Sequence, residues 1–294
     1  MAAILRNLLV SFSMTSAIVF GKFLGLPALC QDTNIDPTDF SDSAVDHSVS
    51  PLRRAHAHND YYHDRPLLDA LDQGFCSVEA DVFLIDGELR VAHSVLEIRK
   101  QVTLKKLYLD PLRERCAVNG GRVYQDGPRL ILLIDFKTDA EPTYAALKAL
   151  LAEYKEMLVR FEDGKIIEGA VQVIISGNRP VATMGGEVSR LAFLDGRMSD
   201  LAAGASPDLV PLISDQWSSQ FKWRGRGAMP EPEQTKLKSI VDKAHARNCK
   251  LRFWGAPDNP ACWRTLFDAQ VDLINTDQLA ELAAYLKSKN AANE

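Results

Sequence analysis

The stretch SVEADVFLIDGELRVAHS, residues 77–94, decides the fold of this chain. It predicts two strands joined at Asp86-Gly87, because this dipeptide is typical of tight hairpin turns. Glu79 and Asp81 are two residues apart, so on a strand both side chains point to the same face. Two carboxylates on an inward face repel each other unless a proton or a cation lies between them. The stretch therefore predicts a hairpin that carries an acidic site.

On both sides of this hairpin, from about residue 52, short apolar runs alternate with amphipathic segments. The other runs typical of strands are RLILLIDFK, AVQVIISGN, SRLAFLD, LVPLISD, KLRFWGA and VDLINTD. The segments typical of helices are RPLLDALDQG, EPTYAALKALLAEYKEML, EPEQTKLKSIVDKAHARN, NPACWRTLFDAQ and TDQLAELAAYLKSK, the last behind a Thr276/Asp277 cap. Repeated strand-then-helix order predicts a parallel sheet with helices outside, and the number of strands favours a TIM-type (βα)8 barrel, which can be irregular, over an open sheet.

The working residues of such barrels lie at the carboxyl ends of the strands. In LILLIDFK, Asp135 follows five apolar residues and shares a strand face with Lys137. Together with Glu79 and Asp81 it suits one hard divalent cation, Mg²⁺ or Ca²⁺, since these ions prefer oxygen ligands. For any one of the acids alone, a salt bridge at a strand end explains the pattern equally well.

Histidines follow two of the predicted strands. RRAHAHND places His58 at the end of the first strand, and LRVAHS places His93 at the end of the strand that pairs with the acidic one. Histidine titrates near neutrality, so two of them can act as base and acid on either side of one reacting centre. His56 shares the strand face of His58, and a structural role, orienting that histidine or filling the barrel floor, is favoured for it.

Four motifs, AHNDY, SVEADVFLIDGELRVAHS, TLKKLYLDPL and LIDFK, resemble those of the phosphatidylinositol-specific phospholipase C-like phosphodiesterases. The branch most similar to them is the one named for altered inheritance of mitochondria protein 6, related to the glycerophosphodiester phosphodiesterases. The resemblance implies a TIM-type barrel that cleaves phosphodiesters with a divalent ion. By motif, it assigns His58 and His93 to catalysis, Glu79, Asp81 and Asp135 to the metal, and Lys137 and Trp254 to the substrate pocket.

Two departures from the glycerophosphodiesterases leave the substrate class and the number of metal ions open. Those enzymes carry HRG followed by ENT, whose Glu also contacts metal, whereas this chain has HND and no such Glu. Asn59, assigned here to the substrate pocket, can supply an oxygen ligand in its place. The segment from Ser94 to Pro128 is also short for the subdomain that those enzymes insert.

Other classes of function are less well supported. With a net charge of −5 and no long basic run, the 294-residue chain offers no electrostatic support for nucleic-acid binding. His56 and His58 form an HxH pattern, as in amidohydrolases and PHP-type phosphoesterases, but after His93 only His245 remains to complete such a site. A non-catalytic binding barrel is disfavoured by the presence of both histidines and all three acids. No GxSxG elbow, Walker loop or dinucleotide fingerprint is present.

The expected partner is a small phosphodiester or a phospholipid, and the sequence does not specify an oligomeric state. The loop DQWSSQFKWRGRG is either packed, which is favoured, or a rim that makes peripheral contact with a membrane. Residues 1–30 have a basic start, an apolar middle and a small-residue exit, which predicts a signal peptide or an N-terminal anchor.

The chain is therefore expected to be exported to the periplasm or the extracellular space. Residues 31–51 are expected to form a flexible acidic linker and residues 52–289 the barrel. Four cysteines, Cys76, Cys116, Cys249 and Cys262, are either paired in disulfides or buried as free thiols.

Overall fold

The structure, a computed structural model, describes residues 49–125 and 127–291. The predicted signal or anchor at 1–30 and most of the predicted acidic linker lie outside these residues. Within them, no helix is both long and apolar enough to cross a bilayer.

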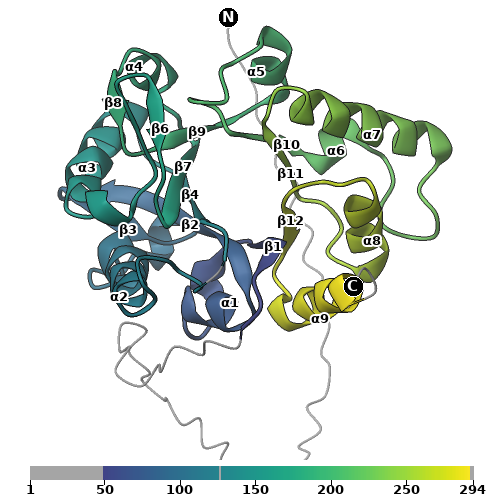
Figure 1. Cartoon of the computed structure of the whole chain (residues 1–294), viewed down its shortest axis with the longest axis horizontal. Helices are drawn as coiled ribbons and strands as arrows, with labels where there is room; N and C mark the ends of the chain where they lie inside the picture. Colours follow the sequence, from purple (N-terminus) through teal and green to yellow (C-terminus); the bar gives the residue numbers. More distant parts are fainter. Residues whose placement is uncertain (1–48, 126, 292–294) are drawn as a thin grey trace, which may run out of the picture. The chain divides into compact units, whose positions relative to one another are not determined.

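In the described part of the chain, eight strands follow one another in sequence order around a mostly parallel sheet (Figure 1). They are β1 (Leu52–Ala57), β2 (Phe75–Ile85), β4 (Leu130–Phe136), β7 (Val171–Gly177), β9 (Phe193–Gly196), β10 (Leu212–Gln216), β11 (Lys250–Trp254) and β12 (Ile274–Thr276). β12 pairs in parallel with β1, and a single bridge between Arg252 and Leu273 links β11 to the start of β12. The ring of strands is therefore nearly closed, and the prediction of an irregular TIM-type (βα)8 barrel is confirmed.

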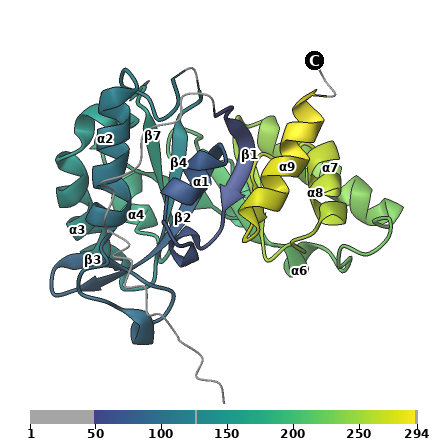
Figure 2. The ribbon, with the colours of Figure 1, turned by 90° about the horizontal axis from the view of Figure 1, so that it is seen from below.

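Helices surround the ring of strands (Figures 1 and 2). They are α1 (Leu68–Asp72), α2 (Asp110–Val118), α3 (Ala140–Ala152), α4 (Val181–Gly185), α5 (Met198–Ala203), α6 (Trp217–Gln220), α7 (Glu231–His245), α8 (Pro260–Asp268) and α9 (Leu279–Ala291). Single turns occur at η1 (Asp60–Tyr62), η2 (Val95–Glu97), η3 (Lys105–Leu109) and η4 (Lys155–Met157). The five helices expected from the sequence are all present. The Asp110-Pro111 start of α2, with proline in the first turn, went unrecognised.

Alternation along each strand separates two apolar layers. Val78, Ala80 and Val82 of β2 face the helices and belong to the large outer core. Inside the ring, a smaller cluster forms the floor of the barrel: Ile131, Leu133, Val159, Ile174, Phe193, Leu212 and Leu273. Because successive inward positions of β4 run from Ile131 through Leu133 to Asp135, the interior changes from apolar at the floor to charged at the carboxyl ends of the strands.

The predicted hairpin is formed by β2 and β3 (Glu88–Val91), which pair antiparallel from Val82↔Val91 to Ile85↔Glu88. Asp86 and Gly87 both have positive φ, 52° and 81°, as a two-residue turn between twisted strands requires. The turn returns the chain antiparallel beside the end of β2, and the Ala92 amide donates to the Asp81 carbonyl. The segment after β3 therefore starts at the carboxyl end of the barrel.

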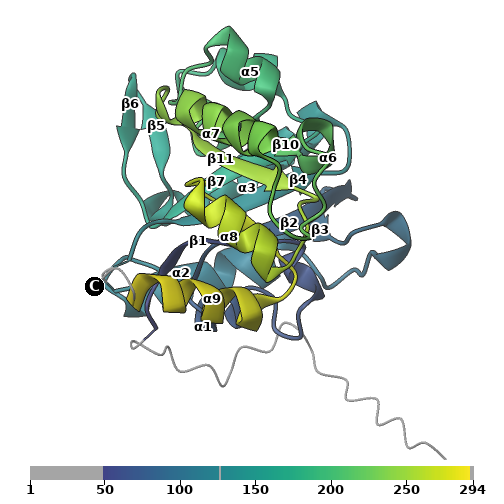
Figure 3. The ribbon, with the colours of Figure 1, turned by 90° about the vertical axis from the view of Figure 1, so that its right-hand side faces the viewer.

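One predicted strand, SRLAFLD, is divided in the structure. Its first part forms β8 (Ser189–Arg190), which pairs with β5 (Arg160–Glu162) and, through β5, with β6 (Lys165–Ile167), while its second part is β9 of the barrel. Arg190 stacks on the ring of Phe161, with 4.0 Å between guanidinium and ring centroid, which holds the first part on this small sheet. Figure 3 shows β5 and β6 on the side away from the β2–β3 hairpin.

A buried carboxylate, Asp60, joins the loop after β1 to two neighbouring elements. Its Oδ2 accepts hydrogen bonds from the Leu67 amide and from the Tyr108 hydroxyl, and its buried Oδ1 has no partner. Burial raises the pKa of Asp60 to about 7. Because this exceeds the unfolded value of about 4, the folded form binds the proton more tightly, so the stability that Asp60 contributes is fully present below about pH 4 and is lost as pH rises to about 7.

We therefore expect Asp60→Asn to raise the free energy of unfolding at pH 8 by about 2–4 kcal/mol and to remove most of the loss between pH 5 and pH 8. An asparagine oxygen can accept both hydrogen bonds without carrying charge. Urea unfolding at the two pH values measures the effect. Asp242→Asn, which neutralises an exposed carboxylate paired with Lys238, serves as the control and should change little. A wild-type stability that does not vary between these pH values would contradict the prediction.

Candidate active site

Three carboxylates meet at the carboxyl end of the barrel. Glu79 and Asp81 come from β2 and Asp135 from β4, and the two strands pair with Asp81 directly beside Asp135. One oxygen from each carboxylate can be chosen so that all three lie within 4.8 Å of one another. Parallel pairing in register thus brings together the three acids that the sequence singled out.

Two buried side chains hold the Glu79 carboxylate in place. Its Oε2 lies 2.9 Å from Nη2 of Arg252 and 3.1 Å from Nε2 of His56. Burial by itself would raise the pKa of Glu79, but the Arg252 charge and the His56 hydrogen bond outweigh it and hold the pKa well below its usual range. The Glu79 carboxylate is therefore ionised and fixed in orientation.

His56 is a positioning residue in this arrangement. Burial, and then the charge of Arg252, lowers its pKa to about 4, so the ring is neutral at pH 7. A carboxylate only accepts hydrogen bonds, so Nε2 carries the proton and donates to Glu79, while Nδ1, 2.7 Å from the Ser77 hydroxyl, accepts. The structural role favoured for His56 fits this geometry, but its hydrogen-bond partners are Glu79 and Ser77 and not His58.

Lys137 lies between the other two acids. Its Nζ is 3.0 Å from Oδ2 of Asp81 and 2.9 Å from Oδ2 of Asp135. Burial raises the pKa of both carboxyl groups, and the lysine charge only partly opposes this effect. Gly177, at the end of β7, makes room for Asp135, because a side chain there would collide with Oδ1 of the carboxylate.

The donor set fits a divalent cation. Three carboxylates and two cations, Lys137 and Arg252, leave one negative charge on the cluster, and Oδ1 of Asp81 is buried without a hydrogen-bond partner. Carboxylate oxygens are the ligands that Mg²⁺ and Ca²⁺ prefer. No histidine belongs to this cluster, which is the only grouping of at least three potential metal ligands within residues 49–125 and 127–291.

The two predicted catalytic histidines lie at the same end of the barrel. His58 directly follows β1, and its Nδ1 is 2.8 Å from Oδ1 of Asp277, just beyond β12. Burial lowers the pKa of His58, but the hydrogen bond to Asp277 and the charge of Glu79 outweigh it, so the pKa is raised. Because the carboxylate accepts a hydrogen bond from the Nδ1–H group, Nε2 of neutral His58 remains available as an acceptor.

His93, two residues after β3, lies beside Asp81. Its Nδ1 is 3.3 Å from Oδ2 of Asp81 and 3.2 Å from the hydroxyl oxygen of Tyr61. The Tyr61 hydroxyl is also 2.8 Å from Asp81 and 2.9 Å from Oδ1 of Asn59. Asn59, proposed as a substrate or metal contact, is therefore linked to Asp81 through the Tyr61 hydroxyl. Trp254, at the end of β11, is 40% exposed.

Sequence reasoning missed four residues of this site. Arg252 carried a usable signal, since it is the one charge at an inward position within the apolar run LRF and shares its strand face with Trp254. Asp277 was expected, with Thr276, to cap a helix. In the structure its Oδ1 is hydrogen bonded to His58, and the Thr276 hydroxyl accepts a hydrogen bond from the amide of Gln278, just before α9. For Tyr61 and Gly177, no sequence pattern specified which way the loop and the strand end would turn.

The structure also decides between the alternatives that the sequence left for the aromatic loop, the HxH pattern and the cysteines. Trp217, Phe221 and Trp223 are buried, so the loop DQWSSQFKWRGRG is packed, as favoured, and does not form an exposed aromatic rim. His245 lies on α7 and contacts Asp272 outside the barrel, which leaves the HxH pattern without its further ligands. Four cysteines are buried free thiols: Cys76, Cys116, Cys249 and Cys262.

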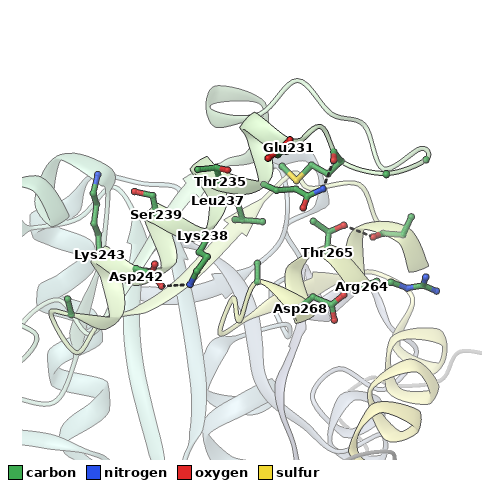
Figure 4. A pocket seen from close by; sticks show the side chains of 17 residues that line it. Glu231, Thr235, Leu237, Lys238, Ser239, Asp242, Lys243, Arg264, Thr265 and Asp268 are labelled. Carbon is green, nitrogen blue, oxygen red and sulfur yellow. Dashed lines mark hydrogen bonds and ion pairs between the residues drawn. The ribbon is translucent and has the colours of Figure 1, made fainter.

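A separate groove of about 1130 Å³ lies between α7 and α8 on the outer face of the barrel (Figure 4). Its walls carry an exposed ion pair, Lys238–Asp242, together with single polar groups such as Thr265 and Arg264. It contains no histidine and no convergent set of acids, so the groups able to perform acid–base or metal chemistry lie at the barrel end and not in this groove.

Two known protein families match parts of this chain. Residues 43–195 match the AIM6-like phosphodiesterase domain, and residues 250–280 match the glycerophosphoryl diester phosphodiesterase family. Altered inheritance of mitochondria protein 6 of Saccharomyces cerevisiae is 32% identical over 83% of this chain and 73% of its own length. The proteins of that name from Eremothecium gossypii and Candida glabrata are 30% and 31% identical, over 77% and 69% of their lengths. The first matched segment contains the three acids and both histidines, and the second contains Arg252 and Asp277.

Proposed function

The chain belongs to the AIM6-like phosphodiesterase family, and from this membership we propose that it is a metal-dependent phosphoric diester hydrolase that uses histidine acid–base catalysis. The observation that carries the proposal is the meeting of Glu79, Asp81 and Asp135 with His58 and His93 at one end of the barrel. Acids alone would suit a binding site for a cation. Two imidazoles beside them add the groups that a hydrolase needs.

Each protein group has a defined task in this proposal. A divalent cation, Mg²⁺ or Ca²⁺, held by the three carboxylates, would neutralise charge that develops on the phosphate. Lys137, fixed between Asp81 and Asp135, adds a positive charge next to the same oxygens. Arg252 and His56 keep the Glu79 carboxylate ionised and turned toward the cluster.

The two histidines move protons. One removes the proton of the attacking hydroxyl, which is water or a neighbouring alcohol of the substrate, and the other protonates the alkoxide that leaves. A neighbouring alcohol as nucleophile would give a cyclic phosphate as the first product. Asp277 holds Nδ1 of His58, so that Nε2 is the atom presented to the substrate.

The substrate proposed is a lipid-derived phosphodiester or a glycerophosphodiester. The half-exposed ring of Trp254, at the end of β11, can pack against an apolar or choline-like part of such a molecule. We also propose that the protein is exported, on the composition of residues 1–30.

The decisive experiment is hydrolysis of a phosphodiester panel after metal removal. The full chain, stripped with EDTA, is assayed on a glycerophosphodiester, a lysophospholipid and phospholipid vesicles, and the products are identified by phosphorus NMR. We expect at least about a hundredfold loss on stripping and recovery with Mg²⁺ or Ca²⁺. Hydrolysis that resists EDTA would refute the metal requirement, and recovery with Zn²⁺ or Mn²⁺ alone would favour a transition-metal site. Absence of hydrolysis across the metal-restored panel would refute the proposal.

A further inference from the structure

Exposed apolar side chains gather beside the active site. Leu96 is 98% exposed, Val95 is 66% exposed and Tyr62 is 59% exposed. All three lie near His93: Val95 and Leu96 follow it in η2, and the rings of Tyr62 and His93 are 5.9 Å apart. Exposed apolar side chains that gather in one place are typical of an interaction surface.

The segment from residue 92 to residue 101 is a loop with a closed base, which we call the rim loop. The Val91 amide donates to the carbonyl of Val102, and Arg90 bridges to Thr103, so both ends are fixed on β3. Inside the loop, Glu97 accepts hydrogen bonds from the His93 amide and the Tyr62 hydroxyl, both at 3.2 Å. These contacts fix the apolar tip relative to the catalytic end of the barrel.

Exposed basic side chains outnumber exposed acidic ones in the rim loop and η3. Arg99 and Lys100 belong to the rim loop and Lys106 to η3, and all three are exposed. Glu97, the exposed acid of the rim loop, accepts hydrogen bonds from the His93 amide and the Tyr62 hydroxyl. In Figure 2 the segment after β3 lies at the end of the barrel to which the strand arrows point, beyond β2. An apolar tip with flanking cations matches an anionic lipid surface, whose acyl layer takes the apolar groups and whose headgroups attract the cations.

We propose that the rim loop and Tyr62 form a docking surface for an anionic phospholipid membrane, which presents the active site to phosphodiesters in the lipid headgroups. Cleavage of a lipid headgroup rests on the function proposed above, whereas docking on the membrane does not depend on that function. The surface differs from the aromatic loop suggested by the sequence, which is buried.

Binding is measured by sedimentation of the full chain with vesicles of phosphatidylcholine alone or mixed with an equal amount of phosphatidylserine. We expect tighter binding to the mixed vesicles. Leu96→Asp should weaken it at least about tenfold, since it loses an apolar contact and adds a like charge. Val188→Asp is the matched control, because Val188 is 79% exposed but precedes β8, in the small sheet away from the rim loop, and should bind as wild type does.

A second measurement tests whether the rim loop itself, and not another part of the chain, enters the bilayer. In Leu96→Trp, the added fluorescence should be quenched by brominated phosphatidylcholine in mixed vesicles, and in Val188→Trp it should not. Equal quenching of the two variants overturns the inference, whatever the total binding. Wild type that binds vesicles but cleaves no phosphodiester would leave docking standing and remove the proposed function. Wild type that cleaves a soluble phosphodiester but does not bind vesicles would support the proposed function and overturn the docking inference.

Discussion

Asp81→Asn is expected to lower kcat/KM for phosphodiester hydrolysis by at least about a thousandfold. Asp81 belongs to the cluster with Glu79 and Asp135 and has one carboxylate oxygen, buried Oδ1, without a protein partner. Loss of a metal ligand removes several kcal/mol of charge stabilisation, and each 1.36 kcal/mol corresponds to a factor of ten. The amide retains the size of the carboxylate, so the surrounding packing is kept.

Thermal unfolding distinguishes this effect from misfolding. Burial raises the pKa of Asp81, and the charges of Glu79 and Asp135 raise it further, so the metal-free carboxylate is strained electrostatically. Asp81→Asn should therefore fold at least as stably as metal-free wild type, while losing the rise in Tm that Mg²⁺ or Ca²⁺ gives wild type. Asp60→Asn, which neutralises another buried carboxylate, should keep both that rise and activity. An Asp81→Asn enzyme that retains the metal-dependent rise would exclude this residue as a ligand.

The barrel could be predicted because its signals are local. Strands such as LILLIDF are continuous apolar runs, as expected where both faces are buried, and each is followed by an amphipathic segment. The small sheet of β5, β6 and β8 could not be predicted in this way. Its strands have two or three residues, too few for a periodic pattern, and its pairing depends on contacts such as Arg190 on Phe161.

The acids were predictable for a related reason. Strand periodicity places Glu79 and Asp81 on one face, and an inward charge at the end of β4 indicates Asp135. The residues that hold these groups were not predictable, because their partners are far away in the sequence. Arg252 reaches Glu79 across 173 positions and Asp277 reaches His58 across 219. Only closure of the barrel, which brings β12 beside β1 and β11 beside β12, creates those pairs.

His58→Ala and His93→Ala should each lower kcat/KM by about 10²–10⁴, the usual contribution of a positioned acid or base. Each change removes the proton-transfer group but leaves the three carboxylates in place, so the metal-dependent rise in Tm should persist. Replacement of His245, the exposed histidine of α7, is the control and should leave the rate unchanged. If both variants hydrolyse a generic phosphodiester at the wild-type rate, the histidines are not the acid and base.

Asp277→Asn tests whether Asp277 raises the pKa of His58. Burial lowers the pKa of His58, whereas the hydrogen bond to Asp277 and the charge of Glu79 raise it by more. Removing the Asp277 charge should therefore lower the pKa, and the limb of the kcat/KM pH profile that reports His58 should move to lower pH. A purely structural role for Asp277 would reduce the rate equally at all pH values without moving either limb. Because Asp277 touches only Nδ1, the loss in rate should be smaller than for His58→Ala, and an equal loss would place Asp277 among the groups that contact substrate.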